Sequence, residues 1–420
     1  MKYLEEFFSN WRQLLAASVG MAFGYTLNNY LNNVFIPPLV QEFSWPRSLV
    51  ALIGLPAVLS FVFQPLAGHL TDRLGVRSVA LFGVIVAPLI YLALSAMSGS
   101  FTQFFILNLL QIALVASTTG AVVYSRLIAQ DFNLARGMAL ALIACTPSVA
   151  GIFVAPILSD YIDQEGWRAA YVAVAAVTGL TGLLAVMLIP SSKADKHKAV
   201  FTLKGGRSDY GAIIRNPAFK YIVLGMGLCS ISVTVQASQL KLVIESMGVT
   251  SQDASWMISM YASGVIGGRL ACGAALDRFP AHRVAAISLG LPGVGLSLIA
   301  LGVTSPLVVA LAVLLLGLSL GTELDVAGYL IMRFFPVEVY STVIGIVIGA
   351  IAVSGSLGSL LLSISLNISD SYSIFLMFSA ICAFFGANLF ISLGGISPHE
   401  RGNQSANEQT DLVPEPEGRR

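Results

Sequence analysis

Apolar runs of membrane-spanning length recur along the whole 420-residue chain, and this repetition constrains its fold more than any other feature. A helix needs about 20 mostly apolar residues to cross the hydrocarbon core of a bilayer. Soluble domains carry about 25% charged residues, whereas this chain has 11% charged and 56% hydrophobic residues. The sequence therefore predicts an all-α membrane protein.

Polar breaks between the apolar runs predict about twelve transmembrane helices. We place them near residues 14–39, 48–70, 78–97, 101–127, 136–160, 168–189, 219–243, 253–275, 283–302, 306–332, 338–365 and 371–395. The longest polar interruption divides them six and six. The predicted organisation is a six-helix bundle (1–189), a cytoplasmic linker (190–218), a second six-helix bundle (219–395) and a disordered polar tail (396–420).

The distribution of basic residues predicts the orientation in the membrane. With a cytoplasmic amino terminus, 19 of the 23 Lys and Arg residues fall on the cytoplasmic side. The outer side receives Arg47, Arg168 and Lys241. Lys241 lies where it can snorkel to water, and a transient contact with an incoming anion is one of its possible roles. This bias places both termini and the linker inside the cell. The short termini and compact linker favour a bacterial inner membrane, with the first span retained rather than cleaved.

Several classes of function are disfavoured by the residues that the chain lacks. Its cysteines lie inside apolar spans without CxxC spacing, and its four histidines form no cluster, so we expect no metal and no cofactor. No nucleophile–base pair, phosphate loop or nucleotide-binding motif is present, which argues against an enzyme and against ATP as the energy source. The net charge of +1, spread over short loops, gives no reason to expect nucleic acid as a partner.

One arginine, Arg269, lies inside the predicted span 253–275. An arginine at this depth costs on the order of 3 kcal/mol, so chains that keep one usually direct it at a water-filled path or an anion. Its planar guanidinium binds carboxylates in bidentate fashion. The alternative is a structural ion pair that sets helix register.

Two acidic residues, Glu323 and Asp325, lie at a matching depth in the span 306–332. They precede Arg333, at the cytoplasmic end of that helix, by ten and eight residues, roughly 12–15 Å at 1.5 Å per residue. Arg269 precedes Asp277 by eight residues and is therefore roughly 12 Å inside. The two acids point in different directions, so one can pair with Arg269 while the other caps structure or faces a cavity. We predict that they are the proton-coupling candidates.

A run of amides in the first span forms a second polar cluster, beginning at Tyr25 and including Asn28, Asn29, Asn32 and Asn33. Such side chains can bind an oxygen-rich solute or can link helices to one another. Only one of the pairs one turn apart can face a cavity fully. Similar polar candidates in other spans are Gln111, Thr118, Thr119, Tyr124, Gln236 and Gln239. Ser354, Ser356 and Ser359 are expected to allow close packing.

A short motif closes the second and the eighth predicted helix. Gly68 precedes Asp72 and Arg73, and 205 residues later Gly273 precedes Asp277 and Arg278. Glycine permits close helix approach, while the acid and the base can pair with neighbouring helix ends. We predict a hinge or loop latch on the cytoplasmic side rather than a substrate contact.

The first of these motifs, with Gly75 and Arg77, resembles the loop signature of the major facilitator superfamily, and the resemblance covers about residues 10–395. Finer features are similar to the branch of monocarboxylate transporters and oxalate:formate antiporters. They are Phe43-Ser-Trp45-Pro-Arg47, Ala135-Arg136-Gly137, Gly166-Trp167-Arg168, Gly268-Arg269-Leu270, Gly321-Thr-Glu323-Leu-Asp325, Tyr329-Leu330 and Arg333-Phe-Phe.

The resemblance implies two pseudo-symmetric six-helix bundles around a central cavity, with transport by alternating access. It also implies that Arg269 binds a substrate carboxylate and adds Tyr329 to the substrate-binding candidates. Two positions depart from the branch. Val265 stands where many members have an acid or amide, and no Lys or Arg occurs between Val339 and Ile364, where oxalate carriers are expected to have a second cation.

The sequence thus predicts a secondary active transporter of a small organic anion, a monocarboxylate, coupled to proton symport. Substrate displaces a protein carboxylate from Arg269, and the displaced acid takes up a proton. A single buried cation favours one substrate carboxylate. The alternative is uptake or efflux of a neutral or cationic solute, with Arg269 held in a structural ion pair. The expected partners are the anion, protons and the lipid bilayer, and we expect a functional monomer.

Overall fold

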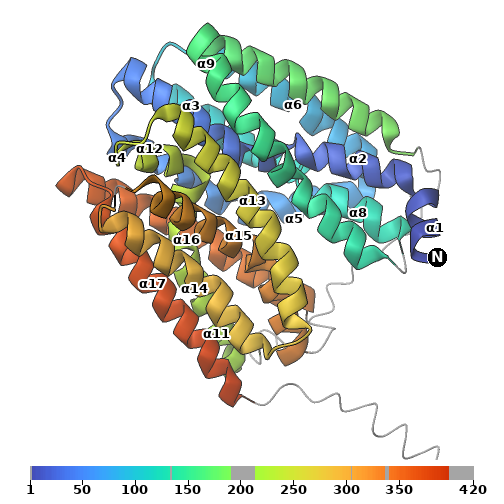
Figure 1. Cartoon of the computed structure of the whole chain (residues 1–420). Helices are drawn as coiled ribbons and strands as arrows, with labels where there is room; N and C mark the ends of the chain where they lie inside the picture. Colours follow the sequence, from blue (N-terminus) through green and yellow to red (C-terminus); the bar gives the residue numbers. More distant parts are fainter. Residues whose placement is uncertain (1, 133–134, 191–212, 304, 336–339, 397–420) are drawn as a thin grey trace, which may run out of the picture.

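The computed structural model describes residues 2–132, 135–190, 213–303, 305–335 and 340–396. Every regular element within these ranges is a helix (Figure 1), as predicted. Nearly all of the predicted tail and most of the predicted linker lie outside the described residues.

In the first half of the chain, short 3₁₀- and π-helical segments interrupt several of the α-helices. The α-helices are α1 (Lys2–Ser9), α2 (Trp11–Ala22), α3 (Asn28–Phe43), α4 (Arg47–Ala51), α5 (Ser60–Leu74), α6 (Val76–Ser95), α7 (Phe101–Leu110), α8 (Ala121–Asp131) and α9 (Arg136–Leu188). The 3₁₀ segments η1 (Tyr25–Leu27) and η2 (Leu52–Leu59) connect α2 to α3 and α4 to α5, while the π-helix η3 (Gln111–Ala116) follows α7.

The second half begins with α11 (Pro217–Cys229), which continues through η4 (Ser230–Ser232) and the π-helix η5 (Val235–Gln239) into α12 (Leu240–Glu245). Five long helices follow. They are α13 (Ser251–Leu276), α14 (Ala281–Ala300), α15 (Pro306–Phe334), α16 (Tyr340–Ser369) and α17 (Ser373–Ser392), with η7 (Leu393–Gly395) at the end.

The 53-residue α9 is two helices joined at a sharp break. Gly166 has φ +82° and ψ 160°, a conformation that glycine adopts without the steric cost of a side chain. The chain reverses direction there (Figure 1). This break separates the segments predicted as spans 136–160 and 168–189.

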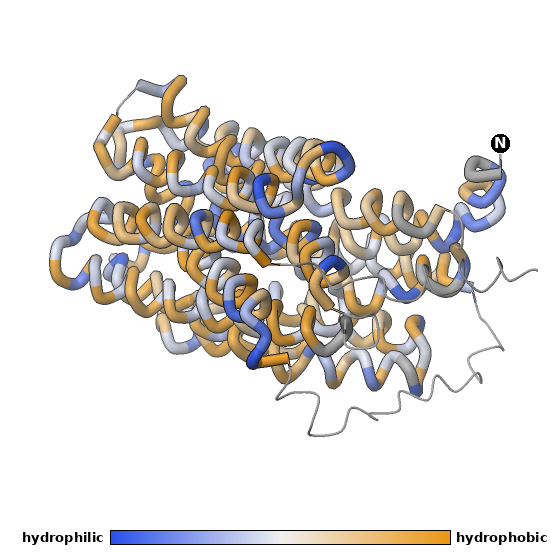
Figure 2. The backbone as a smooth tube through the Cα atoms, turned by 90° about the horizontal axis from the view of Figure 1, so that it is seen from below, coloured by the Kyte–Doolittle hydropathy of each residue, from blue (hydrophilic) through white to orange (hydrophobic). Residues whose placement is uncertain are grey.

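Nine helical segments in the described residues are long and apolar enough to cross a membrane, judged by length and composition alone. They include α9 as one segment and leave out α3, with its four asparagines, and α13, with Arg269. The count of twelve spans therefore stays a prediction. Apolar residues predominate along the helices in Figure 2, and many large ones, such as Leu180, Met187 and Leu307, are exposed, as expected for side chains that face lipid.

The helices before and after residues 191–212 pack mainly within their own group. In the first group α2 and α6 lie against α9, and in the second α13 packs against α15 and α14 against α17. We call the side of the molecule with the described chain ends the inner side and the opposite side the outer side, following the predicted orientation. The bundle boundaries of the sequence prediction stay a prediction.

Contacts between the two groups gather in the outer halves of the helices, and we call them the outer seal. They join Asn33 Nδ2 with Gln236 O (2.9 Å), Lys241 Nζ with Ser159 Oγ (2.9 Å), Ser259 Oγ with Ile152 O (2.7 Å), Ser356 Oγ with Leu55 O (3.1 Å) and Ser359 Oγ with Ala51 O. The two groups diverge toward their inner ends in Figure 1. The two groups are therefore joined on the outer side and separate toward the inner side.

Candidate functional site

Arg269 of α13 and Asp325 of α15 form an ion pair within the membrane-spanning region. Arg269 Nε lies 3.6 Å from Asp325 Oδ2, and the two side chains are 16% and 38% exposed. Among the described residues, Arg269 Nε has no hydrogen-bond partner. The pair is therefore held by charge without a direct hydrogen bond at Nε, and neither side chain is sealed away from a competing ion.

Glycines bring the two helices of this pair together. Gly264 and Gly268 of α13 face α15 so closely that a Cβ on Gly268 would lie 2.7 Å from the carbonyl carbon of Leu318. Gly317 and Gly321 of α15 are equally crowded by the α13 backbone. Small residues spaced four apart let helix backbones approach in this way. The close approach fixes Arg269 beside Asp325.

The charge of Arg269 also reaches helices of the first group. Tyr30 of α3 and Cys145 of α9 lie within electrostatic range of its guanidinium. Tyr30 donates a 2.9 Å hydrogen bond to Ser148 Oγ, and its ring centre lies 6.2 Å from that of Tyr261 on α13. Arg269 therefore sits where the two groups of helices face each other rather than on the lipid side.

Glu323 has a different environment from Asp325, as their spacing predicted. It is buried, and its carboxylate accepts a hydrogen bond from Ser230 Oγ of η4. Glu323 thus ties α15 to the helix that begins with α11, whereas Asp325 faces Arg269. The structure selects Asp325 as the partner of Arg269, a choice that the sequence left open.

The amides of α3 divide between contacts and open positions. Asn28 is buried, and its Oδ1 accepts a 2.7 Å hydrogen bond from Tyr91 of α6. Asn33 bonds to the outer seal through both side-chain atoms. Asn29 and Asn32 are half-buried, and no side-chain hydrogen bond of theirs is found in the described chain. The amide cluster therefore serves helix contacts at Asn28 and Asn33 and leaves Asn29 and Asn32 as binding candidates.

The candidates around η3 are placed close to one another. Thr119 Oγ1 donates to Val115 O at 2.8 Å and accepts from the backbone N–H of Tyr25 at 3.1 Å. These bonds give Thr119 a structural role. Gln111 is buried, and its Nε2 lacks a hydrogen-bond partner among the described residues.

Gln236 and Tyr329 lie in the second group. Gln236 Nε2 donates to Ser232 Oγ at 2.9 Å, and its Oε1 accepts from Tyr261 at 3.4 Å, so this amide is already bonded within the protein. Tyr329 is half-buried against the apolar core of the inner half, and its side chain forms no hydrogen bond in the part of the chain that is described.

Lys241 departs from the sequence expectation. It is 2% exposed rather than extended to water, because its Nζ donates a 2.9 Å hydrogen bond to Ser159 Oγ of α9. Glu245 lies 4.0 Å from the same ammonium. Lys241 is therefore a second buried cation beside Arg269. The sequence prediction of one substrate carboxylate had assumed that Arg269 was the single buried cation, and that assumption is wrong. Lys241 belongs to the outer seal, away from the depth of Arg269.

The two loop motifs lie at the inner ends of α5 and α13. Arg73, Asp277 and Arg278 are exposed, and no ion pair of theirs occurs within the described ranges. The glycines make no close helix contact in this structure: an added Cβ on Gly273 would meet nothing within 4 Å, and one on Gly68 would have only an ordinary contact. The role of these motifs as a hinge or latch stays a prediction. The inner ends of the two groups are apart in this state, which accounts for the lack of contacts. Of the Asp72 side chain nothing is described.

Sequence reasoning missed Ser230, Tyr91 and Ser159, which hold Glu323, Asn28 and Lys241 respectively. All three are ordinary residues in apolar spans. Each is separated from its partner by at least 63 residues, so no local pattern could have identified it.

Among curated proteins, the chain is similar to human Monocarboxylate transporter 11, with 25% identity over 301 residues. The match covers 69% of this chain and 62% of that relative, so the chain spans less than two thirds of the relative's length.

Two solved structures share the fold. The nucleoside transporter NupG superposes with a TM-score of 0.74 at 15% identity, covering 91% of this chain and 99% of that one. A bacterial homolog of the human lysosomal transporter Spinster, in an inward-facing and unoccupied conformation, gives a TM-score of 0.67 at 14% identity, covering 91% and 98%.

The family model of the Major Facilitator Superfamily matches residues 19–240 and 222–417. Together these ranges include every residue of the Arg269–Asp325 pair and of the outer seal. The all-helical architecture and the two solved structures agree with this match. The chain belongs to the Major Facilitator Superfamily and is a multi-pass membrane transporter rather than an enzyme.

Proposed function

We propose that the protein carries a small monocarboxylate across the membrane together with a proton, by alternating access between its two groups of helices. The observation that carries this proposal is the 3.6 Å pair of Arg269 and Asp325, partly exposed and facing the other group. The similarity to a protein named Monocarboxylate transporter 11 supports the substrate class.

In this mechanism the substrate carboxylate replaces Asp325 on Arg269. Arginine stays charged and presents a planar fork of donors, so it can take the substrate in a bidentate geometry. Asp325 is then left without its counter-ion in a medium of low dielectric constant, which favours its protonated form. Binding of the anion and uptake of the proton are thereby coupled.

Glu323 is a less suitable proton site than Asp325, because it is buried and bonded to Ser230 and no cation among the described residues pairs with it. Lys241 does not call for a second substrate carboxylate, since Ser159 and Glu245 already surround it in the outer seal. These arrangements support one carboxylate and one coupled proton.

The second candidate function is transport of a neutral or cationic solute, in which the same ion pair only sets helix register. The observation in its favour is that Asp325 already balances the charge of Arg269. Counterflow in proteoliposomes with labelled carboxylates and their neutral amide analogues separates the two proposals. Exchange of the amides with no exchange of the acids would favour the second.

Proteoliposome uptake tests the leading proposal with labelled acetate, lactate and benzoate, with and without an inward proton gradient. We expect the gradient to drive accumulation and a protonophore to abolish it. Arg269→Lys keeps the charge and loses the fork. A charge-assisted hydrogen bond contributes about 1.5–3 kcal/mol, so KM should rise roughly tenfold or more. Unchanged KM would contradict bidentate binding.

We further propose that the protein works as a monomer in a bacterial inner membrane with both termini in the cytoplasm. The excess of Lys and Arg on the inner side supports this orientation. Protease protection of tags placed at the two ends, in intact cells, tests it.

A further inference from the structure

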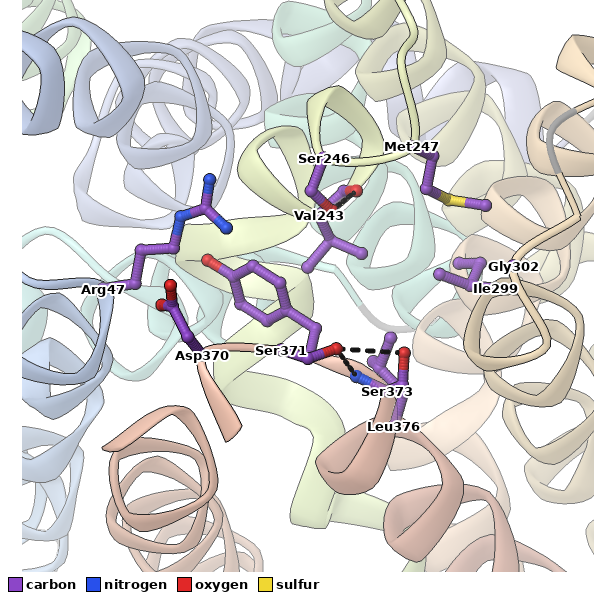
Figure 3. Close-up of a pocket in the computed structure, with 11 residues that line it drawn as sticks. Arg47, Val243, Ser246, Met247, Ile299, Gly302, Asp370, Ser371, Ser373 and Leu376 are labelled. Atoms are coloured by element: carbon purple, nitrogen blue, oxygen red, sulfur yellow. Dashed lines mark hydrogen bonds between the residues drawn. The ribbon is translucent and has the colours of Figure 1, made fainter. Parts of the chain in front are cut away.

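A cavity of about 360 Å³ lies on the outer side, distinct from the Arg269–Asp325 pair (Figure 3). Arg47 reaches it from α4, in the first group of helices. The rest of its wall comes from the second group: the end of α12, the end of α14 and the turn between α16 and α17. The cavity therefore bridges the two groups at the outer seal.

Arg47 is the residue in this cavity that points to a ligand. Its guanidinium carbon lies 5.9 Å from the centre of the Tyr372 ring, and the side chain is half-buried. Within the described chain it has no ion pair and no hydrogen-bond acceptor. Asp370, on the exposed turn below it in Figure 3, lines the same cavity without pairing with it. A guanidinium with unused donors in a concave site suits a carboxylate.

The rest of the wall defines what accompanies that carboxylate. Val243, Ile299, Leu376 and the ring of Tyr372 supply apolar surface. The volume lies near the lower end of the range for small-molecule sites, about 300–1,000 Å³. Asp370 adds a negative charge at the rim, which disfavours a dianion. We propose that the cavity binds a small monocarboxylate with an apolar body, its carboxylate on Arg47.

The position of the cavity gives such binding a consequence for transport. Tyr372 Oη donates a 3.1 Å hydrogen bond to Gln239 Oε1, in the segment that also carries Gln236 of the outer seal. Opening the outer side requires α4 to move away from α16 and α17. This motion separates Arg47 from the apolar residues that line the rest of the cavity. The site is complete only while the outer side is closed, so a bound anion stabilises the closed state.

This site therefore regulates the carrier from its outer side. A ligand that binds only the closed state lowers the open population by the factor 1 + [L]/Kd, roughly elevenfold at ten times Kd. An external apolar acid then inhibits by holding the outer seal shut. The inference does not require that Arg269 binds substrate.

A thiol placed in the outer seal measures this effect. Ser359 is fully buried and bonds to the Ala51 carbonyl across the seal, so a cysteine there reacts only after the outer side opens. We would introduce Ser359→Cys in an Arg269→Gln background, which removes the central anion site. The protein in nanodiscs is treated with a thiol reagent, and labelling at position 359 is read by peptide mass spectrometry.

Sodium benzoate at ten times its Kd should slow this labelling to about one tenth of its rate, whereas the neutral isostere benzamide should not. Arg47→Gln should abolish the protection, Arg47→Lys should weaken it, and Asp370→Asn should strengthen it. Each variant is compared with its own rate without benzoate, so a change in basal opening does not interfere.

Three results would overturn the proposal: no protection by benzoate, protection that survives Arg47→Gln, or loss of protection in Asp370→Asn. The last would mean that the Asp370 carboxylate supports the site rather than repelling the anion. If benzoate protects Ser359→Cys when Arg269 is present but not in the Arg269→Gln background, the effect belongs to the central site instead. Because the assay lacks Arg269, its failure leaves the proposed transport function untouched.

Discussion

Replacement of Gly268 by alanine should disturb the site without touching a charged group. Gly268 lies one residue before Arg269, and its backbone is pressed against that of Leu318 on α15. A new Cβ would lie 2.7 Å from the Leu318 carbonyl carbon and 2.8 Å from its Cα. Both obstacles are backbone atoms, so a rotamer change cannot relieve the clash.

The size of the disturbance follows from these distances. Ordinary contact begins at 3.4 Å, and the Leu318 carbonyl oxygen lies even closer to the new Cβ than the carbonyl carbon does, so the two helices must separate by more than about 0.7 Å at this level. Overpacking of this kind costs about 1–3 kcal/mol. The separation also lengthens the 3.6 Å contact between Arg269 and Asp325, so the position of the Arg269 guanidinium is less well fixed. We expect lower thermal stability and a higher KM for the carboxylate substrate.

Gly273→Ala is the matched control, since it changes the same helix where an added Cβ meets nothing within 4 Å. Stability is measured by size-exclusion chromatography after heating, and KM by proteoliposome uptake. Gly268→Ala should lose stability and raise KM, while Gly273→Ala should keep both near the wild-type values. Equal behaviour of the two variants would refute the idea that glycine packing positions Arg269.

Two further predictions concern the outer side. Ser159→Ala leaves the buried ammonium of Lys241 without its hydrogen-bond acceptor, which costs about 1–3 kcal/mol. Thiol labelling in the outer seal should therefore become several-fold faster. The control Ser246→Ala, at an exposed position, should leave the labelling rate unchanged, and equal rates in the two variants would exclude Lys241 from the seal. The hydrogen bond from Trp167 lowers the pKa of the Glu42 carboxyl below its ordinary 4.5. The ionised Glu42 therefore stabilises the folded state at neutral pH, and this contribution is lost as the pH falls through the folded-state pKa. Glu42→Gln should therefore lower the melting temperature at pH 7 and have a smaller effect in acid, and a constant difference across pH would contradict this.

The helical architecture could be predicted from the sequence because apolar runs of the required length are a direct physical demand of the bilayer. Interruptions inside the spans could not be predicted from the sequence in the same way. The break near Gly24 and the π-helix that starts at Gln111 depend on how neighbouring helices pack, and the sequence has no periodic signal for them. The 53-residue α9 could be divided correctly because polar residues surround Gly166.

The site was predictable in depth but not in rotation. Counting residues from helix ends placed Arg269, Glu323 and Asp325 at matching levels, which the ion pair agrees with. Which acid faces the arginine depends on how α13 and α15 are rotated about their axes. Close glycine contacts fix that rotation, and they become visible only when the helices are packed together.

Lys241 illustrates a failure of local reasoning. A lysine near the outer end of a span can usually reach water along its own helix. Here α9 covers it and supplies Ser159, a residue 82 positions away, as its acceptor. Distant chain segments thus decided the exposure of this side chain.

The most direct test of the central claim compares Asp325→Asn with Glu323→Gln in proteoliposomes. Asp325 is the proposed proton-coupling site, because the substrate displaces its carboxylate from Arg269. Glu323 is instead held by a hydrogen bond from Ser230 and has a structural role. Asp325→Asn should lose accumulation driven by a proton gradient while it still exchanges labelled carboxylate for unlabelled, whereas Glu323→Gln should keep gradient-driven accumulation. Gradient-driven accumulation that persists in Asp325→Asn would contradict the account.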